Sequence, residues 1–359
     1  MIPLLIDLEP EWRGGQNQFL LLLKGLYEQG HAAELLAAKG SSLGHRASKL
    51  GVCVHYTSRD KLRVPAARKV RELMSDGRFD LVHVNESHAL TAAWLAAAHR
   101  RVPLLFSRRV GFPLGRGYLS RKRFAAVTRF IASSHWVAEQ AIASGAPKEK
   151  VGVIYEGVAI PEPVTPAARA AARGRWNVRD DQVLLGCAGV LSEDKGQEWV
   201  IRALAELRRQ SPQCRLLLAG DGEDRQRLEA LAAQLNLGDA VIFAGFVRKV
   251  ELFYQAIDLF VFPALFEGLG TSLLAAMAHG VPSVTYFGCA LGEIVENGLS
   301  GLQVEAKNPG ALVLAVRKLL EQPGYAAQLG SAGRERIALR FSADRMVEET
   351  LQCYRAVTA

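Results

Sequence analysis

The strongest chemical signal in this sequence of 359 residues is a carboxylate followed by a glycine-rich turn. Glu267 directly precedes Gly268, Leu269, Gly270 and Thr271, between an apolar run and a helical pattern. Backbone N–H groups at a helix start favour an anion, and an isolated carboxylate accepts hydrogen bonds from hydroxyl groups. The arrangement suits a sugar attached to a diphosphate. The alternative is an ordinary capped turn that binds nothing.

Two further loops carry residue types that hold anions. Lys195 precedes a helix that begins near Gln197, where its ammonium group could neutralise a phosphate together with the helix dipole. Gly14 and Gly15 open another helix, and paired glycines let a ligand approach the backbone. Each signal is weak alone, because most lysines are exposed surface residues and glycine pairs also occur in ordinary strand–helix turns.

Polar side chains also follow two apolar runs in the first half of the chain. Arg108 and Arg109 end one run, and Glu86 and His88 follow another. Adjacent residues of a strand point to opposite faces, so we expect only one arginine to face a ligand. That arginine could clamp a phosphate or carboxylate of an acceptor molecule. The competing interpretation is a pair of exposed arginines.

These residues need elements that bring them together. Short apolar runs alternate with amphipathic stretches, which predicts α/β domains with parallel sheets and helices on both faces. Strands are expected at residues 3–6, 33–37, 81–84, 102–106, 130–132, 151–155, 183–188, 214–219, 241–243, 259–262 and 282–286. Helices are expected at residues 18–29, 64–74, 198–210, 225–235 and 310–322. Ligands of such sheets bind beyond the carboxyl ends of the strands.

The chain is too long for one ordinary core, and a proline-rich segment interrupts the alternation. Three prolines fall within residues 160–166, which predicts a linker. We therefore expect two doubly wound, Rossmann-like domains that face each other across a cleft. Residues 1–160 would form an N-terminal domain, residues 161–342 a C-terminal domain, and residues 343–359 a final helix.

Composition and charge limit the cellular compartment and the binding partners that are expected for this chain. The net charge is +8, and the excess lies in residues 1–165, which hold 23 Lys and Arg against 14 Asp and Glu. A basic half suggests an acidic partner, but no nucleic-acid reading motif occurs, so we expect no nucleic acid. Five scattered cysteines without a C-x-x-C pair favour a reducing compartment and argue against a disulfide framework or a zinc site. Without a long apolar run or a basic signal sequence, we expect a cytoplasmic protein.

One basic segment of the first half also suggests a membrane surface. Basic residues alternate there with apolar ones: Arg116, Arg121, Lys122 and Arg123 lie among Phe112, Leu114, Tyr118, Leu119 and Phe124. This pattern favours peripheral contact with anionic lipid at the inner face of the membrane. A solvated basic face is the alternative.

The order and spacing of several segments resemble a known family. They are Gly14-Gly15, the strand at 80–84, residues 132–135, residues 194–196, residues 219–222, residues 266–270 and residues 293–298. Over nearly its whole length the chain is similar to the GT-B glycosyltransferases of family 4, also called glycosyl transferases group 1. The resemblance implies a GT-B architecture and a retaining enzyme that uses a nucleotide sugar. It also implies that residues 1–160 are the acceptor-binding domain and residues 161–342 the nucleotide-sugar-binding domain.

The resemblance also implies roles for individual residues. Lys195 would bind the donor diphosphate, Glu267 would face the donor sugar, and Gly15 would lie near the transferred group, which makes these three the expected catalytic set. The expected donor contacts are Gly14, Phe246, Val247, Arg248, Gly268, Leu269, Gly270 and Thr271. No metal and no cofactor beyond the nucleotide sugar is implied. The basic first half of the chain fits an acidic acceptor, namely an envelope glycan or glycolipid such as lipopolysaccharide core. As in similar proteins, the final helix would cross back to the first domain.

Five positions depart from the family pattern. Ala275 replaces a second acid, Val190 replaces an arginine that assists Lys195, and Cys289-Ala290 replaces a glycine pair. Asn85 replaces a histidine. Each lost polar contact would cost about 1–3 kcal/mol of ligand binding if nothing compensates. A second hypothesis therefore stays open, in which the chain is a diverged member that acts as a binding partner of an active transferase.

Overall fold

The computed structural model describes residues 1–58, 60–115 and 117–359, and this part of the chain forms two compact units. Unit 1 contains Met1–Gly157 and Ala343–Ala359, and unit 2 contains Val158–Ser342. The first crossing between units thus falls after Gly157, close to the boundary expected at residue 160. The last helix, α15 (Ala343–Thr358), belongs to unit 1.

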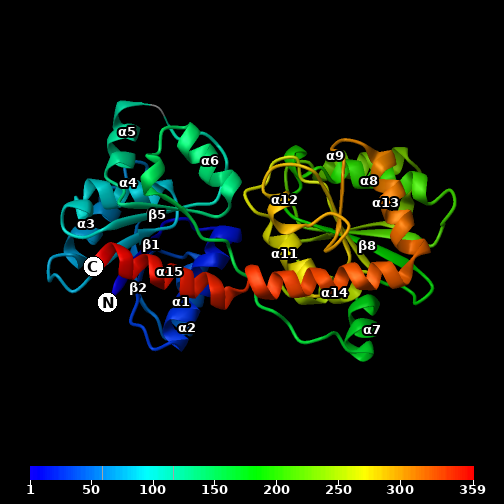
Figure 1. The fold of residues 1–359 in the computed structure, drawn as a ribbon, viewed down its shortest axis with the longest axis horizontal. Helices are drawn as coiled ribbons and strands as arrows, with labels where there is room; N and C mark the ends of the chain where they lie inside the picture. The colour runs from blue at the N-terminus through cyan, green and yellow to red at the C-terminus, as the bar shows by residue number, and fades with distance from the viewer. Residues whose placement is uncertain (59, 116) are drawn as a thin grey trace. The chain divides into compact units, whose positions relative to one another are not determined.

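Unit 1 is built on a parallel sheet of seven strands in the order β3-β2-β1-β4-β5-β6-β7. The strands are β1 (Pro3–Asp7), β2 (Glu34–Ala38), β3 (Cys53–Thr57), β4 (Leu81–Val84), β5 (Leu104–Arg108), β6 (Arg129–Ala132) and β7 (Val151–Val153). The chain winds from β1 outward to β3, then returns to β4 and winds to the other edge (Figure 1). This reversal makes the carboxyl ends of β1 and β4 the switch point where ligands of such sheets bind.

Helices cover both faces of the first sheet, so its central strands are continuous apolar runs. One face packs against α3 (Val64–Leu73), α4 (Ser87–Leu95) and α5 (Tyr118–Ala125). The other packs against α1 (Gly14–Glu28), α2 (Ser42–Lys49) and α15, and α6 (His135–Ala143) packs on β6 and β7. Helix α15 lies beside α1 and buries Met346, Val347, Leu351 and Tyr354 (Figure 1).

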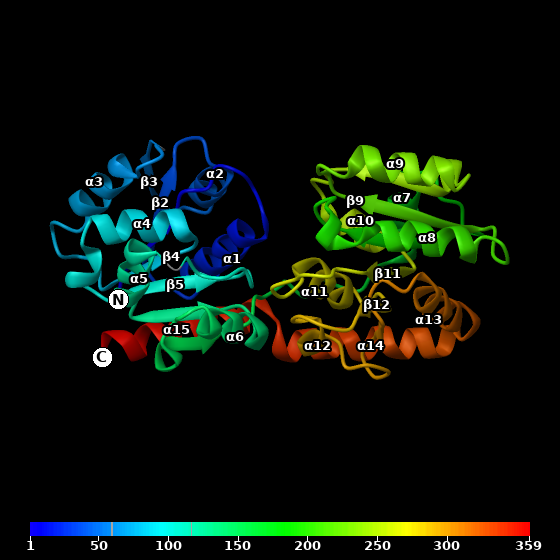
Figure 2. The same ribbon diagram turned by 90° about the horizontal axis from the view of Figure 1, so that it is seen from above.

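Unit 2 repeats the plan with six parallel strands in the order β10-β9-β8-β11-β12-β13 (Figure 2). They are β8 (Val183–Ala188), β9 (Cys214–Ala219), β10 (Val241–Gly245), β11 (Leu259–Phe262), β12 (Ser283–Tyr286) and β13 (Leu302–Val304). One face packs against α8 (Gln197–Leu207), α9 (Arg225–Gln234) and α13 (Pro309–Glu321). The remaining helices are α7 (Pro166–Gly174), α10 (Val250–Ala256), α11 (Thr271–Ala278), α12 (Leu291–Ile294) and α14 (Pro323–Arg340). The predicted pair of doubly wound parallel sheets is confirmed.

The structure adds elements that the apolar pattern did not indicate. Strands β3 and β13 lie at sheet edges, and polar residues interrupt their apolar runs. Helix α14 lacks a strong apolar stripe. The proline-rich segment extends to Thr165, whose hydroxyl accepts a hydrogen bond from the Ala168 amide and caps α7. Among the described residues, no helix combines the length and apolar character needed to cross a bilayer.

Candidate active site

In unit 2, Lys195 and Glu267 meet beyond the carboxyl ends of β8 and β11. Lys195 Nζ lies 3.0 Å from Glu267 Oε2 and donates a hydrogen bond of 3.2 Å to the carbonyl oxygen of Phe266. Asp194 Oδ2 lies 3.4 Å from the same nitrogen. The side chains of Lys195 and Glu267 are each 20% exposed, so solvent and a ligand can reach the pair.

The charge of Lys195 is secure in this setting. Burial alone would lower the pKa of the ammonium group, but the carboxylates of Glu267 and Asp194 outweigh burial and raise that pKa. Lys195 therefore carries its proton at neutral pH. The Lys195 ammonium already touches two carboxylates, so it can bind a dianionic diphosphate only if its contacts with the ligand outweigh the existing ion pair. We therefore expect the Lys195–Glu267 pair to rearrange when the ligand binds.

The glycine-rich turn after Glu267 leads directly into α11. Gly270 has a φ of 101°, a left-handed conformation that favours glycine, and occupies the N-cap position of α11. Among the described side chains none caps this helix, and the first-turn amides of Thr271 and Ser272 have no acceptor within the helix. Glu267 Oε1 accepts a hydrogen bond of 3.2 Å from the Gly268 amide, which fixes the carboxylate at the turn.

The residues expected beside the nucleotide base lie at the same edge of the second sheet. Phe246, Val247 and Arg248 follow β10, and the Phe246 ring is 65% exposed. The Gly220 amide donates to the Gly245 carbonyl at 2.8 Å, which ties the end of β9 to the start of this loop. An aromatic ring left in solvent beside a sheet edge offers a surface on which a base can stack.

The positions that depart from the family pattern offer no charged substitute at the same place. Val190 is 55% exposed, and its carbonyl oxygen accepts a hydrogen bond of 2.9 Å from Gln197 Nε2. Ala275 lies on α11, and its carbonyl oxygen accepts a hydrogen bond of 2.8 Å from His279 Nδ1. Cys289 has a φ of 48°, a conformation suited to the glycine it replaces, and its thiol donates to the Leu265 carbonyl at 3.2 Å.

In unit 1, a buried polar cluster stands at the switch point between β1 and β4. Asp7 closes β1 and is fully buried, and its Oδ2 accepts hydrogen bonds from Gln16 Nε2 at 2.8 Å and from Asn85 Nδ2. Asn85 also donates to the Gly15 carbonyl at 3.2 Å. Gly14 and Gly15 begin α1, and Gly15 lies against Arg109 and Asn85. The glycine pair therefore sits at the edge where ligands bind in this kind of sheet.

The two arginines of the first half have different surroundings. Arg109 Nε lies 2.9 Å from Glu156 Oε1, and Arg109 Nη1 donates to Asn85 Oδ1, which joins this guanidinium to the polar cluster. Arg108 ends β5, is 8% exposed and donates to the Phe112 carbonyl. The interpretation as an exposed pair is wrong. Of the two, Arg109 is the one placed beside Gly15.

Glu86 and His88 lie at the start of α4, where Glu86 acts as the N-cap. Its carboxylate accepts hydrogen bonds from the amides of His88, Ala89 and Leu8. Burial, helped by the nearby Asp7, raises the pKa of Glu86 to about 7. His88 Nδ1 lies 2.7 Å from Arg63 Nη2. Both side chains thus have structural partners, and their expected role toward an acceptor stays a prediction.

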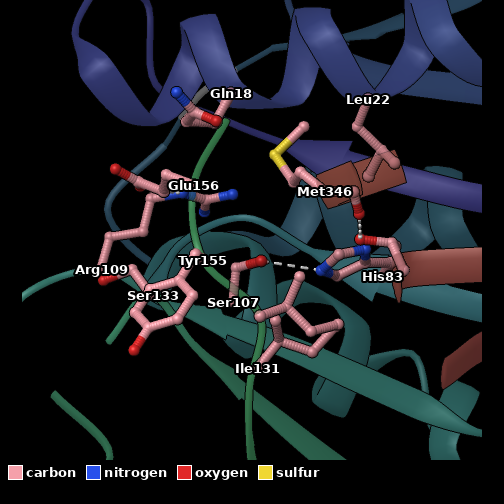
Figure 3. Close-up of a pocket in the computed structure, with 12 residues that line it drawn as sticks. Gln18, Leu22, His83, Ser107, Arg109, Ile131, Ser133, Tyr155, Glu156 and Met346 are labelled. Atoms are coloured by element: carbon pink, nitrogen blue, oxygen red, sulfur yellow. Dashed lines mark hydrogen bonds and ion pairs between the residues drawn. The ribbon is translucent and has the colours of Figure 1, made fainter. Parts of the chain in front are cut away.

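A small cavity in unit 1 adjoins this cluster (Figure 3). Its lining includes Gln18, His83, Ser107, Arg109 and Glu156. His83 bridges Ser107 Oγ at 2.8 Å and the Tyr354 hydroxyl of α15 at 2.6 Å, as Figure 3 shows for the serine. Burial lowers the pKa of His83 to about 3, so this histidine is neutral and belongs to the core.

Sequence reasoning missed three members of the unit 1 cluster, namely Asp7, Gln16 and Glu156. Asp7 could have been found, because it is the last residue of the first strand and the ligand edge of such a sheet is known from the topology. Gln16 and Glu156 gave no comparable signal, since their roles depend on neighbours that only the fold brings together.

Two α/β units, each with a parallel sheet and polar groups at the ends of its strands, define the class of fold. Comparisons with known proteins identify the family. Residues 12–160 match the family model described as Glycosyltransferase Family 4, and residues 168–336 match the one described as Glycosyl transferases group 1. A D-inositol 3-phosphate glycosyltransferase of Geodermatophilus obscurus is 30% identical over 307 residues, which cover 78% of this chain and 67% of that protein. The chain belongs to the group 1 glycosyl transferases.

Solved structures agree on the fold. Anabaena HepE in complex with UDP and glucose has a TM-score of 0.85 at 20% identity, with 99% of each chain covered. The lipopolysaccharide outer core galactosyltransferase WaaB in its apo form has a TM-score of 0.71 at 15% identity, with 99% of each chain covered. The matches to the first curated relatives span about half the length of those proteins.

Proposed function

We propose that the protein is a retaining, metal-independent glycosyltransferase that moves a sugar from a nucleoside diphosphate to a glycan or glycolipid acceptor. The observation that carries the proposal is the contact between Lys195 and Glu267 beside the uncapped start of α11. An ammonium group and helix-start amides are suited to a diphosphate, and a carboxylate is suited to the hydroxyl groups of the attached sugar. Membership of the family and the UDP complex of Anabaena HepE support a nucleotide sugar as donor.

In this proposal the protein acts by position and charge. Lys195 and the amides at the start of α11 would stabilise the negative charge that develops on the leaving diphosphate. Glu267 would orient the donor sugar through its hydroxyl groups. The polar cluster of unit 1, with Gly15, Asn85 and Arg109, would serve the acceptor side. The excess of positive charge in residues 1–165 favours an acidic acceptor such as lipopolysaccharide core.

Nucleotide binding tests the donor site. Calorimetry with UDP, GDP and ADP should reveal one preferred nucleotide. Lys195→Ala should weaken the binding of that nucleotide by about tenfold or more, because a charged hydrogen bond contributes about 1.5–3 kcal/mol. Lys318→Ala is the matched control, since Lys318 lies on α13 over the Tyr325 ring. Unchanged affinity in Lys195→Ala would reject the phosphate role.

The sugar contact needs a separate measurement. Glu267→Ala should lower turnover and nucleotide-sugar affinity more than affinity for the bare nucleotide, because its proposed contact is to the sugar. The side chain also pairs with Lys195, so Glu267→Gln, which keeps a hydrogen-bond acceptor, serves as the milder comparison. An equal loss for nucleotide and nucleotide sugar would contradict the assignment.

A second candidate function rests on Ala275 and Val190, which leave the donor edge without the acid and the cation of the family pattern. In this alternative the chain binds a partner transferase and does not turn over a donor. Release of free nucleoside diphosphate from any of a panel of nucleotide sugars with matched acceptors favours the enzyme hypothesis. No release from any of them favours the hypothesis of a binding partner. A large gain in donor affinity in Ala275→Glu would also identify a degenerate site.

We also propose peripheral contact with anionic lipid through α5. Tyr118 is 70% exposed and Leu119 is 62% exposed, and Lys122 Nζ lies 4.5 Å from the Tyr118 ring centre. Leu114 and Phe124 are buried and cannot contribute, and Arg116 lies outside the described residues. Sedimentation with anionic vesicles should capture the protein, and Tyr118→Ser with Leu119→Ser should release it. Equal capture by neutral vesicles would contradict an electrostatic contact.

A further inference from the structure

Three side chains of metal-binding type meet at the outer edge of the unit 1 sheet. Glu34 begins β2, and Cys53 and His55 lie on β3, the edge strand of the sheet. Glu34 is the register partner of Cys53, and His55 is two residues further along β3. Side chains alternate along a strand, so all three point to the same face.

The distances suit a small cation. The ligating atoms of Glu34, Cys53 and His55 all lie within 4.8 Å of one another. His55 Nε2 lies 3.7 Å from Cys53 Sγ and 2.5 Å from Glu34 Oε2. A tetrahedral zinc ion would hold the nitrogen and sulfur about 3.6 Å apart and the nitrogen and oxygen about 3.3 Å apart. The first distance already fits, and the second needs a shift of about 0.8 Å in the carboxylate.

The surroundings leave room for this binding. Cys53 is exposed, and the side chains of His55 and Glu34 are 20% and 14% exposed, so an ion can enter from solvent. Arg78 Nη2 lies 3.0 Å from Glu34 Oε2. His55 and Arg78 contact the same carboxylate oxygen. The carboxylate must therefore turn on binding, so that one oxygen binds the ion while Arg78 stays on the other as a second-shell partner.

We propose that Glu34, Cys53 and His55 bind a zinc ion, with water in the fourth position. Binding forms a bond between Cys53 Sγ and the ion, and the thiol proton passes to solvent. The ion would fasten β3 to β2. The site lies at the amino end of these strands, away from Asp7 and Asn85 at the carboxyl ends, so it is independent of the proposed sugar transfer. The sequence pattern argued against zinc because the ligands come from two strands and form no short motif.

Cobalt titration of the full chain after EDTA treatment tests the site. One equivalent of Co²⁺ should give thiolate-to-cobalt charge-transfer absorption that Zn²⁺ abolishes. Cys53→Ser should remove this absorption, and His55→Gln should weaken Co²⁺ binding by about tenfold or more, since loss of even a second-shell partner costs 10–100-fold. Absence of the absorption, or its survival in Cys53→Ser, would overturn the proposal.

Two variants serve as controls. Cys353→Ser removes a half-buried cysteine of the same unit, and His88→Gln removes a member of a second cluster of possible ligands, Glu9, Glu86 and His88. Both should keep the absorption. A labelling experiment on the unaltered chain avoids any folding defect: Zn²⁺ should protect Cys53 from iodoacetamide, as read by mass spectrometry. An equal labelling rate with and without Zn²⁺ would contradict the site.

Discussion

Glu86 is a single carboxylate whose raised pKa should make the stability of unit 1 depend on pH. Its pKa rises from 4.5 to about 7, chiefly through burial and then through the charge of Asp7. The folded state therefore holds the proton more tightly than the unfolded state between these values. Stability from this group is greatest below pH 4.5 and is lost as the pH rises toward 7.

Glu86→Gln should reduce this pH dependence while keeping an oxygen that accepts the amide hydrogen bonds of the α4 cap. We expect the free energy of unfolding of unit 1 to fall less steeply between pH 4.5 and 7 in the variant. Peptide-resolved hydrogen exchange in urea at several pH values measures this free energy of unfolding. Burial also raises the pKa of Asp7, so some slope should remain. Identical slopes in the two proteins would show that Glu86 does not carry the effect.

The sequence predicted where a residue lies when a charged residue falls at the end of a predicted strand. Lys195 and Glu267 were expected at strand ends, and the structure places them in contact there. Their role in donor binding stays a prediction. The ion pair of Arg109 with Glu156 and the bond of Asn85 to Asp7 join segments that lie far apart in the sequence and meet only after folding, so no local pattern in the sequence predicts them.

At the scale of elements, the contact between α1 and α15 is set by one glycine. A Cβ atom added at Gly25 would lie 2.5 Å from Val347 Cγ2. Gly25→Ala should gain about 1 kcal/mol of helix propensity, but overpacking costs about 1–3 kcal/mol, so we expect a net loss of stability.

Val347→Ala in the same chain should relieve that overlap. A double-mutant cycle, followed by urea unfolding, should give a favourable coupling of about 0.5–3 kcal/mol between the two positions. Strict additivity would mean that α15 shifts away from α1 at no cost.

At this scale, strands were predicted where their own residues form an apolar run. Strands covered on both faces, such as β1 and β9, were predicted because continuous apolar runs identify them. Edge strands β7 and β10 were also predicted, because their own residues are apolar, whereas β3 and β13 were missed because polar residues interrupt them. Their presence follows from hydrogen bonding to β2 and β12, which is information held in the sheet and not in the strand itself.

For the whole molecule, α15 links the end of the chain to the stability of unit 1. Removing residues 343–359 would take away the buried side chains of Met346, Val347, Leu351 and Tyr354. At about 1.5–3 kcal/mol for each, the loss is about 6–12 kcal/mol, which is comparable to the total stability of a domain. Hydrogen exchange should show unit 1 unprotected and unit 2 unchanged. Full protection of unit 1 would contradict this account of α15.

The position of α15 has a consequence for how the protein is made. Ribosomes produce residues 158–342 as one uninterrupted stretch, so unit 2 has all of its parts while synthesis continues. Unit 1 begins first but waits for residues 343–358, which emerge after unit 2. Unit 1, which is synthesised first, is therefore the last to be completed. Until α15 is made, the nascent chain must keep the apolar surface of α1 that α15 covers away from other chains.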